Sequence, residues 1–164
     1  MKSSNRFALL ATVVAALGTL SSAAIAATAS GTASATVIAP ITITSTTPLN
    51  FGSFSNAAAG TVTIDTAGAR TSSGVLLSAV TAGARGVFTV GGSNNAGFSI
   101  TSPQGFSVTT AGGSPMAFAL TLPGTTGTLS SGSATINVGG VLTVGAAQLA
   151  GTYTGSYSVV VEYN

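Results

Sequence analysis

The sequence predicts an all-β fold, a single antiparallel β-sandwich, on three observations. Glycine contributes 22 of the 164 residues, and Gly-rich turn signals such as 91–95 and 112–115 recur along the chain. Between the turns, short runs of Thr, Val, Ile and Phe alternate polar and apolar residues. Helical character is confined to the first 26 residues and, weakly, to 147–149. Many short strands separated by Gly-rich turns are typical of a sandwich or barrel.

Strands are expected at the alternating runs. In chain order these runs are 61–64, 87–90, 98–101, 106–109, 116–122, 134–138, 141–144 and 152–163, with Gly139-Gly140 interpreted as a turn. A β-solenoid is the competing architecture, because Gly and Thr are also abundant in such folds. Only one internal echo is present, Thr66–Arg70 with Thr81–Arg85. Because one echo does not establish a repeat array, the sandwich is favoured.

The amino terminus has the organisation of a secretory signal peptide. Lys2 and Arg6 precede a short apolar run over 7–20, and Ala24-Ile25-Ala26 fits the small-residue pattern of a cleavage site. The apolar run is shorter than the roughly 20 residues that a membrane-spanning helix needs. The expected organisation is therefore a signal peptide over 1–26, an extended segment over 27–40, and one β-sandwich domain over 41–164.

Charge and composition exclude several classes of function. After the predicted cleavage, Arg70 and Arg85 are balanced by Asp65 and Glu162, so the mature chain has no net charge and no basic surface for nucleic acid. The sequence contains no His and no Cys, which removes imidazole and thiol chemistry. Two separated carboxylates are too few for a metal site or a paired-carboxylate mechanism. We expect no enzyme activity, no catalytic residues, no metal site and no cofactor.

The carboxyl-terminal residues alternate most regularly. One face of the predicted strand carries the candidate partner-binding residues of an acceptor edge, Tyr153, Gly155, Tyr157, Val159, Val161 and Tyr163. The other face is polar except for Val160. A glycine on the apolar face suggests a bulge, or a place where another backbone approaches. The run predicts a core strand, with a partner's strand beside it as the sharper hypothesis.

A second alternating segment precedes the domain. Its candidate donor-strand residues are Ala29, Gly31, Ala33, Ala35, Val37 and Ala39, each followed by a polar residue as far as Thr36. Strand addition to a neighbour supplies main-chain hydrogen bonds, with side-chain pockets at alternate positions. Pro40 removes a ladder donor and so marks a break before the domain. The alternatives are a partly disordered leader and a segment that folds back on its own domain.

Several of these runs resemble a known family. Ala39–Ile43, Leu49–Gly52, Gly139–Val144 and the ending Gly151–Asn164 resemble the bacterial domain of unknown function 4402 family. The resemblance implies a small exported, immunoglobulin-like or pilin-like β-sandwich, and Tyr163 would take the place of the penultimate tyrosine of chaperone–usher pilins. This chain departs from the usual pilin pattern because it has no cysteine pair and its candidate donor segment is rich in small residues.

The expected function is that of a structural subunit of an extracellular filament or pilus-like polymer, assembled by strand donation. Its partners would be copies of itself or related subunits, with a secretion chaperone as a further candidate. It would reach the cell surface through the periplasm and keep no membrane span after cleavage. The alternative is a monomeric exported or cell-surface binding module, adhesin-like, that uses its loops.

Overall fold

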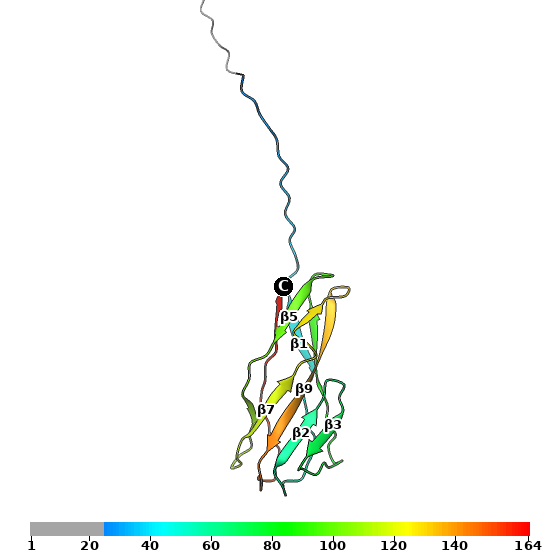
Figure 1. Cartoon of the computed structure of the whole chain (residues 1–164), viewed down its shortest axis with the longest axis vertical. Coiled ribbons are helices and arrows are strands. Elements are labelled where there is room, and N and C mark those ends of the chain that lie inside the picture. Colours follow the sequence, from blue (N-terminus) through cyan, green and yellow to red (C-terminus); the bar gives the residue numbers. More distant parts are fainter. Residues whose placement is uncertain (1–24) are drawn as a thin grey trace, which may run out of the picture. The chain divides into compact units, whose positions relative to one another are not determined.

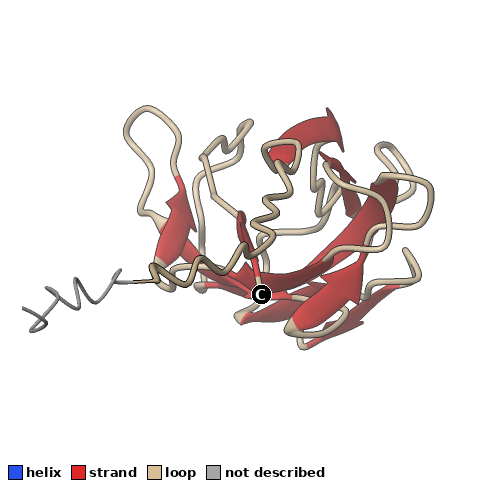
Figure 2. Cartoon of the chain, turned by 90° about the horizontal axis from the view of Figure 1, so that it is seen from above, coloured by secondary structure: helices blue, strands red, loops and turns tan. Residues whose placement is uncertain are grey.

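The structure, a computed structural model, describes residues 25–164 (Figure 1). Residues 1–24 of the predicted signal peptide lie outside this range. Two units are distinguished along the chain, with the boundary between Thr36 and Val37, and the second unit contains every strand of the described residues. No helix is present in the described part, and all strand pairs are antiparallel, so the predicted all-β sandwich is confirmed (Figure 2).

The larger sheet has seven strands. Its main path runs β1 (Thr42–Thr47), β4 (Gly86–Gly91), β9 (Ser133–Val144), β2 (Gly60–Ile64) and β3 (Arg70–Ser73). The short β6 (Phe106–Val108) pairs with β7 (Met116–Thr121), which pairs with β9. The smaller sheet has the order β10 (Val160–Tyr163), β5 (Gly97–Thr101) and β8 (Thr126–Thr128). β1 and β10 are therefore each at the edge of their sheet.

We call the hydrophobic cluster that lies between the two sheets the upper core. It combines inward side chains of β4 and β9 with those of β5, Leu129 and the last residues of the chain; the buried members are Phe88, Val90, Phe98, Ile100, Leu129, Ile136, Val138, Val159 and Val161. Alternate residues of each strand are buried, as the period of two predicts. This half of the domain is closed by sheet on both sides.

We call the second hydrophobic cluster the lower core, and it has a sheet on one side only. Its buried residues come from β2, β7, β9 and two loops: Phe51, Val62, Ile64, Val75, Met116, Phe118, Leu142 and Val144. Side chains from the connection after β1 and from the carboxyl-terminal segment, including Leu49, Tyr153 and Tyr157, pack against this cluster. The cover of the lower core is thus made of segments outside any sheet ladder.

The turn predicted at Gly139-Gly140 is wrong. β9 continues through both residues, which are buried. A Cβ built on Gly139 would lie 2.3 Å from Ile64 O, and one on Gly140 would lie 3.0 Å from Ala119 O. These glycines therefore permit β2 and β7 to approach the backbone of β9 closely, which is the other meaning of glycine inside a strand.

The predicted twelve-residue carboxyl-terminal strand is only partly correct. The alternation holds except at Gly155, because every other odd residue from Tyr153 to Tyr163 is buried or half-buried and every even residue is exposed. The ladder with β5 covers only Val160–Tyr163, preceded by one isolated bridge from Thr154 to Thr109. At Gly155, a Cβ would lie 2.2 Å from Ser107 O, so the approaching backbone suggested by this glycine belongs to β6 of the same chain.

The short repeated motif, Thr66–Arg70 and Thr81–Arg85, has a local structural role. The Arg70 guanidinium donates to Thr81 O at 2.9 Å, and the Arg85 guanidinium donates to Thr66 O at 3.4 Å and to Ala67 O at 2.7 Å. Each copy of the motif therefore uses its arginine to bind the first carbonyl oxygen of the other copy. Both arginines thus donate to carbonyl oxygens of loops.

Candidate functional site

Two segments run antiparallel along the open side of the domain, and we call the space between them the seam. The first is 39–56, which contains β1, and the second is 148–163, which contains β10. Hydrogen bonds that involve side chains connect the two segments at three points. Tyr163 Oη donates to Ala39 O at 2.8 Å, Leu49 N–H donates to Tyr157 Oη at 3.3 Å, and Asn56 Nδ2 donates to Gln148 O at 2.8 Å.

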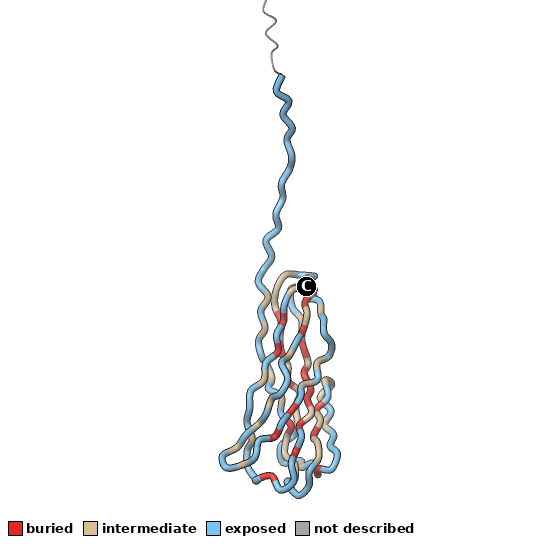
Figure 3. Tube along the Cα trace, turned by 60° about the vertical axis from the view of Figure 1, so that its left-hand side comes forward, coloured by how far each residue is buried: buried red, intermediate tan, exposed pale blue. Residues whose placement is uncertain are grey.

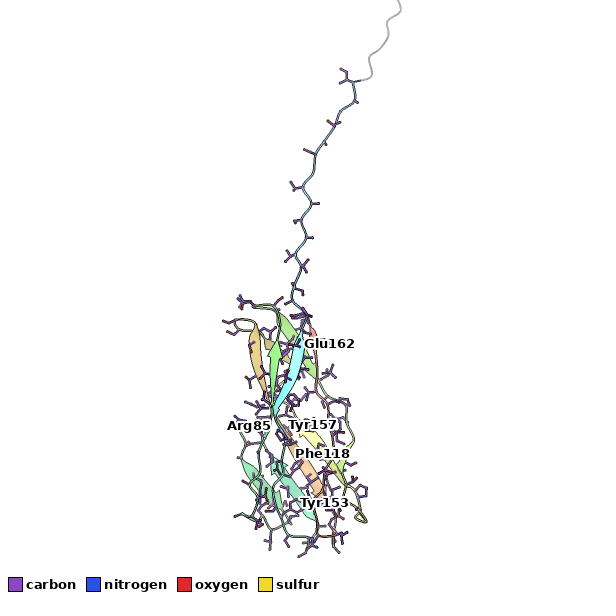
Figure 4. The ribbon with its side chains drawn as sticks, turned by 180° about the vertical axis from the view of Figure 1, so that it is seen from behind. Arg85, Phe118, Tyr153, Tyr157 and Glu162 are labelled. Atoms are coloured by element: carbon purple, nitrogen blue, oxygen red, sulfur yellow. The ribbon has the colours of Figure 1, made fainter. Side chains whose placement is uncertain are left out.

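No strand ladder joins the two sides of the seam. β1 pairs only with β4, and β10 pairs only with β5. The side chains of Tyr157 and Tyr163 cross the seam on the core side, where both pack against the upper core. Figure 4 shows Tyr153, Tyr157 and Glu162 spaced along the domain, with Tyr157 beside Phe118. The seam is therefore a long space between two unpaired strand edges, and the side chains beneath it are apolar.

The main-chain groups of the carboxyl-terminal segment show which edge is open. In an antiparallel pair, the N–H and C=O of successive residues point alternately to the two neighbouring strands. Asn164 N–H donates to Gly97 O, while Ile100 N–H points the other way, to Thr125 O. With the register Val161 opposite Ile100, the main chain of Val161 and Tyr163 must point away from β5 and into the seam.

The same alternation of main-chain direction holds near Thr154, earlier in the carboxyl-terminal segment. Thr154 exchanges both main-chain hydrogen bonds with Thr109, at 2.8 and 2.9 Å, so even residues face the β5–β6 side and odd residues face the seam. Among the described residues, no hydrogen bond joins the main chain of an odd residue from 153 to 163 to another group. The odd residues thus direct their side chains toward the core and their main-chain groups into the seam, where no other strand pairs with them.

The lower part of the seam widens into a groove of about 620 Å³. It lies between 48–56 and 148–157, above Met116 and Phe118 of β7. Its floor is aromatic: Phe51 and Phe118 have ring centroids 5.8 Å apart, and Phe118 and Tyr157 have centroids 6.2 Å apart. The groove is bordered by the buried side chains Phe51, Met116 and Phe118 and by the half-buried Tyr153 and Tyr157, on the side where no sheet covers the lower core.

The Tyr157 hydroxyl is the perturbed titratable group of the seam. Burial raises the pKa of Tyr157 above its ordinary value of 10.0, and the hydrogen bond from Leu49 N–H lowers it by less. The phenol therefore stays neutral across the physiological range. It serves as a hydrogen-bond acceptor and an apolar surface, and it supplies no acid–base chemistry there.

The structure brings the six candidate acceptor residues together on one side of one segment. Val159 and Val161 are buried, Tyr153, Tyr157 and Tyr163 are half-buried, and Gly155 is exposed but lies against Ser107. Whether they bind a partner stays a prediction. Ser93 was missed: its N–H donates to Tyr163 Oη at 2.8 Å, and its Oγ accepts from Ala39 N–H at 2.8 Å. It lies in a predicted turn, where no sequence signal marks it.

The six candidate donor residues do not form a strand. Every residue from 25 to 40 is exposed and in no regular element (Figure 3). No atom lies within 4 Å of a Cβ built on Gly31, and Val37 is 96% exposed. Ala39 differs from the others because both its main-chain groups are bound by the domain. The segment is thus an alternating sequence whose residues are all exposed.

The remaining polar groups suggest no second site. Asp65 Oδ1 accepts from Ala69 N–H within a turn, and Glu162 is exposed on the polar face of β10. The part of the chain from 25 onward contains no group of three or more His, Cys, Asp or Glu residues that could hold a metal ion. In the same range, no helix has the length and hydrophobicity to cross a membrane.

Comparison with known proteins gives one match. A family model described as "Domain of unknown function (DUF4402)" matches residues 41–163, the range that holds every strand and most of the seam. Neither the curated proteins nor the solved structures contain a match. The family suggested by the sequence motifs is therefore confirmed, and its description assigns no activity.

Proposed function

This chain belongs to the DUF4402 family, and we propose that it is a structural subunit of an extracellular surface filament, joined to its neighbours by β-strand donation. The observation that carries the proposal is the unoccupied edge of the carboxyl-terminal segment. Its odd residues present free main-chain N–H and C=O groups to the seam. Such an edge is a ready template for pairing with another strand.

The occupant we propose is the segment 27–38 of a second copy. The edge from Tyr153 to Tyr163 spans ten residue steps, about 33 Å, and 27–38 spans about 36 Å when extended. The segment is exposed and alternates apolar with polar residues over most of its length. The chain thus contains both an open edge and a strand of matching length that is not paired.

The seam also suits this occupant chemically. Its floor is formed by aromatic and aliphatic side chains, and 27–38 contains no charged residue, so insertion would bury no charge. An inserted strand would satisfy main-chain groups on the edge and cover the half-buried side chains that border the groove. With a mature net charge of zero, neighbouring copies would not repel each other.

Export, surface location and the absence of catalysis are parts of the same proposal. The signal-peptide pattern at 1–26 supports export. A structural role fits a described chain whose few charged side chains are engaged in turns and loops or lie on an exposed strand face. A groove without a nucleophile–base pair can bind a strand, and it offers no group to transform a substrate.

The test compares the chain starting at Ala27 with one starting at Ile41, by size-exclusion chromatography with light scattering. We expect multimers from the first and monomers from the second, because only the first retains the donor. Monomers from both would contradict strand donation and favour the monomeric binding module.

A pair of point variants refines the test. Val37→Asp places a carboxylate on the apolar face of the donor, and Thr36→Asp places the same charge on its polar face. Since Val37 is 96% exposed in the unpaired chain, neither change should alter the thermal stability of the domain. We expect Val37→Asp to reduce the multimer fraction at least tenfold, because burying an unpaired charge is costly, and Thr36→Asp to leave it within about twofold. Equal loss in both variants would contradict a strand with one inward face.

A further inference from the structure

The end of the candidate donor is held by the domain through two side chains, and we call this arrangement the clamp. Ser93 Oγ accepts from Ala39 N–H at 2.8 Å, and Tyr163 Oη donates to Ala39 O at 2.8 Å. Ser93 N–H in turn donates to Tyr163 Oη at 2.8 Å. Both main-chain groups of Ala39 are therefore bound by two side chains that also bind each other.

We propose that this clamp directs the segment before Ala39 to a neighbouring copy, by preventing it from closing onto its own seam. The inference rests on the proposed strand donation and names a regulatory feature of the same site. In this role the Ser93 and Tyr163 side chains are positioning groups for the chain that donates the strand, whereas the main chain of Tyr163 belongs to the acceptor edge.

Self-closure would require a sharp change in the path of the chain. Ala39 lies at Tyr163, and Leu49 lies at Tyr157, so the chain after Ala39 descends along one side of the seam. For 27–38 to occupy that same seam, the chain must reverse tightly between Ala39 and Ile41. The segment would then be antiparallel to β1 and parallel to β10.

The clamp blocks that reversal at the residues that would form it. A residue that flanks a hairpin turn as part of a hydrogen-bonded pair uses its own N–H in the ladder, and an N–H donates to one acceptor in good geometry. The Ala39 N–H is already bound by Ser93, and Pro40 has no N–H. Two successive residues are thus unable to donate in a hairpin, whereas a strand from another copy does not require this turn.

The packing around the clamp holds Tyr163 in place. A Cβ built on Gly92 would lie 2.2 Å from Tyr163 Oη and 2.9 Å from Leu129 Cδ1, so glycine is needed for the tyrosine to reach Ala39. The ring also packs against the upper core. The hydroxyl position is therefore set by the folded domain and not by the flexibility of the segment.

The experiment measures self-closure directly. The chain has no cysteine, so an introduced pair gives an unambiguous disulfide. With Ala39 beside Tyr163, a parallel self-closed strand places residue 34 near residue 158, and Ser34→Cys with Ser158→Cys reports it as an internally cross-linked monomer on a non-reducing gel. This pair is introduced into the chain from Ala27 with the native clamp, with Tyr163→Phe and with Ser93→Ala.

We expect little internal cross-linking with the native clamp. Tyr163→Phe retains the ring but removes two of the hydrogen bonds, and Ser93→Ala removes the acceptor for Ala39 N–H. Each should raise the internally cross-linked fraction, by about fivefold for each hydrogen bond lost. In the cysteine-free chain, the same variants should lower the multimer fraction measured by light scattering, with the thermal midpoint of the domain changed little.

Ser72→Ala is the matched control for Ser93→Ala. It removes a serine hydroxyl of β3, outside the seam, one that donates to Val75 O at 2.7 Å, and it should change neither readout. Unchanged cross-linking in both clamp variants, with multimers still formed, would overturn the clamp and leave strand donation intact. A native chain that stays monomeric would overturn strand donation, while the cysteine pair would still show whether the clamp prevents self-closure.

Discussion

Two segments near the ends of the described chain have similar sequence patterns and different structures. Residues 29–39 and 153–163 both alternate with a period of two. The carboxyl-terminal segment is docked on the domain, with its odd residues buried or half-buried except Gly155. The amino-terminal segment has no regular element, and all its side chains are exposed. Alternation alone therefore does not determine whether a segment pairs with its own sheet.

The difference follows from the size of the alternating side chains. The inward residues of the carboxyl-terminal segment include three tyrosines and two valines, which contribute large apolar areas. Those of the amino-terminal segment are Ala and Gly except for Val37. At about 0.8 kcal/mol for each buried methyl group, small side chains do not outweigh the conformational entropy lost on ordering, about 1–2 kcal/mol for each residue. Main-chain hydrogen bonds to a partner's open edge would have to supply the rest.

The largest effect is expected when a methyl group is added to matched glycines of the two segments. At Gly155 a Cβ would lie 2.2 Å from Ser107 O, and at Gly31 it would meet nothing within 4 Å. Gly155→Ala should therefore destabilise the domain by about 3 kcal/mol, because the segment must move away from β6. Gly31→Ala should change the free energy of unfolding by less than about 0.5 kcal/mol.

Urea unfolding of both variants, followed by far-ultraviolet circular dichroism, measures this contrast. A stable Gly155→Ala variant would mean that the carboxyl-terminal segment is not held against β6. A destabilised Gly31→Ala variant would mean that the amino-terminal segment packs on its own domain.

A smaller effect is expected from neighbouring valines of β10. Val161 is 9% exposed and Val160 is 41% exposed. Val161→Ala should cost about 2 kcal/mol, from two buried methyl groups and the cavity that remains. Val160→Ala should cost less than about 0.5 kcal/mol. Equal losses in chemical denaturation would show that β10 does not present one face to the core, and the comparison between the two segments would fail.

The architecture was predictable because the strands alternate and the turns are rich in glycine. One prediction failed because glycine occurs both in turns and where two backbones approach closely within a sheet. Gly139-Gly140 is buried within β9 because Ile64 O and Ala119 O approach its backbone, and nothing local distinguishes this from a turn. β3 and β8 were not predicted, because Arg70–Ser73 and Thr126–Thr128 contain no hydrophobic residue.

The candidate site was predictable in part. The six apolar-face positions of the carboxyl-terminal segment follow from alternation, which also fixes the direction of their main-chain groups. The partners across the seam do not follow from it, because Leu49 and Asn56 reach Tyr157 and Gln148 through tertiary contacts over about a hundred residues of sequence. Ser93 belongs to a turn, and only the folded domain brings it to Ala39.

The smallest effect is expected from the Tyr157 hydroxyl, as a pH dependence. Burial raises the pKa of Tyr157 in the folded chain, whereas an unfolded tyrosine ionises near pH 10. The folded state therefore retains the proton longer, and the native chain should lose stability as the pH rises above about 10. Tyr157→Phe lacks this loss, but at neutral pH it should be about 1 kcal/mol less stable, because Leu49 N–H loses its acceptor. Thermal unfolding from pH 7 to 11 should show the gap between the two proteins narrowing above about pH 10. Tyr153→Phe, which leaves Tyr157 in place, should retain the alkaline loss of stability. A constant gap would mean that Tyr157 is solvated and that the seam has no buried floor at its centre.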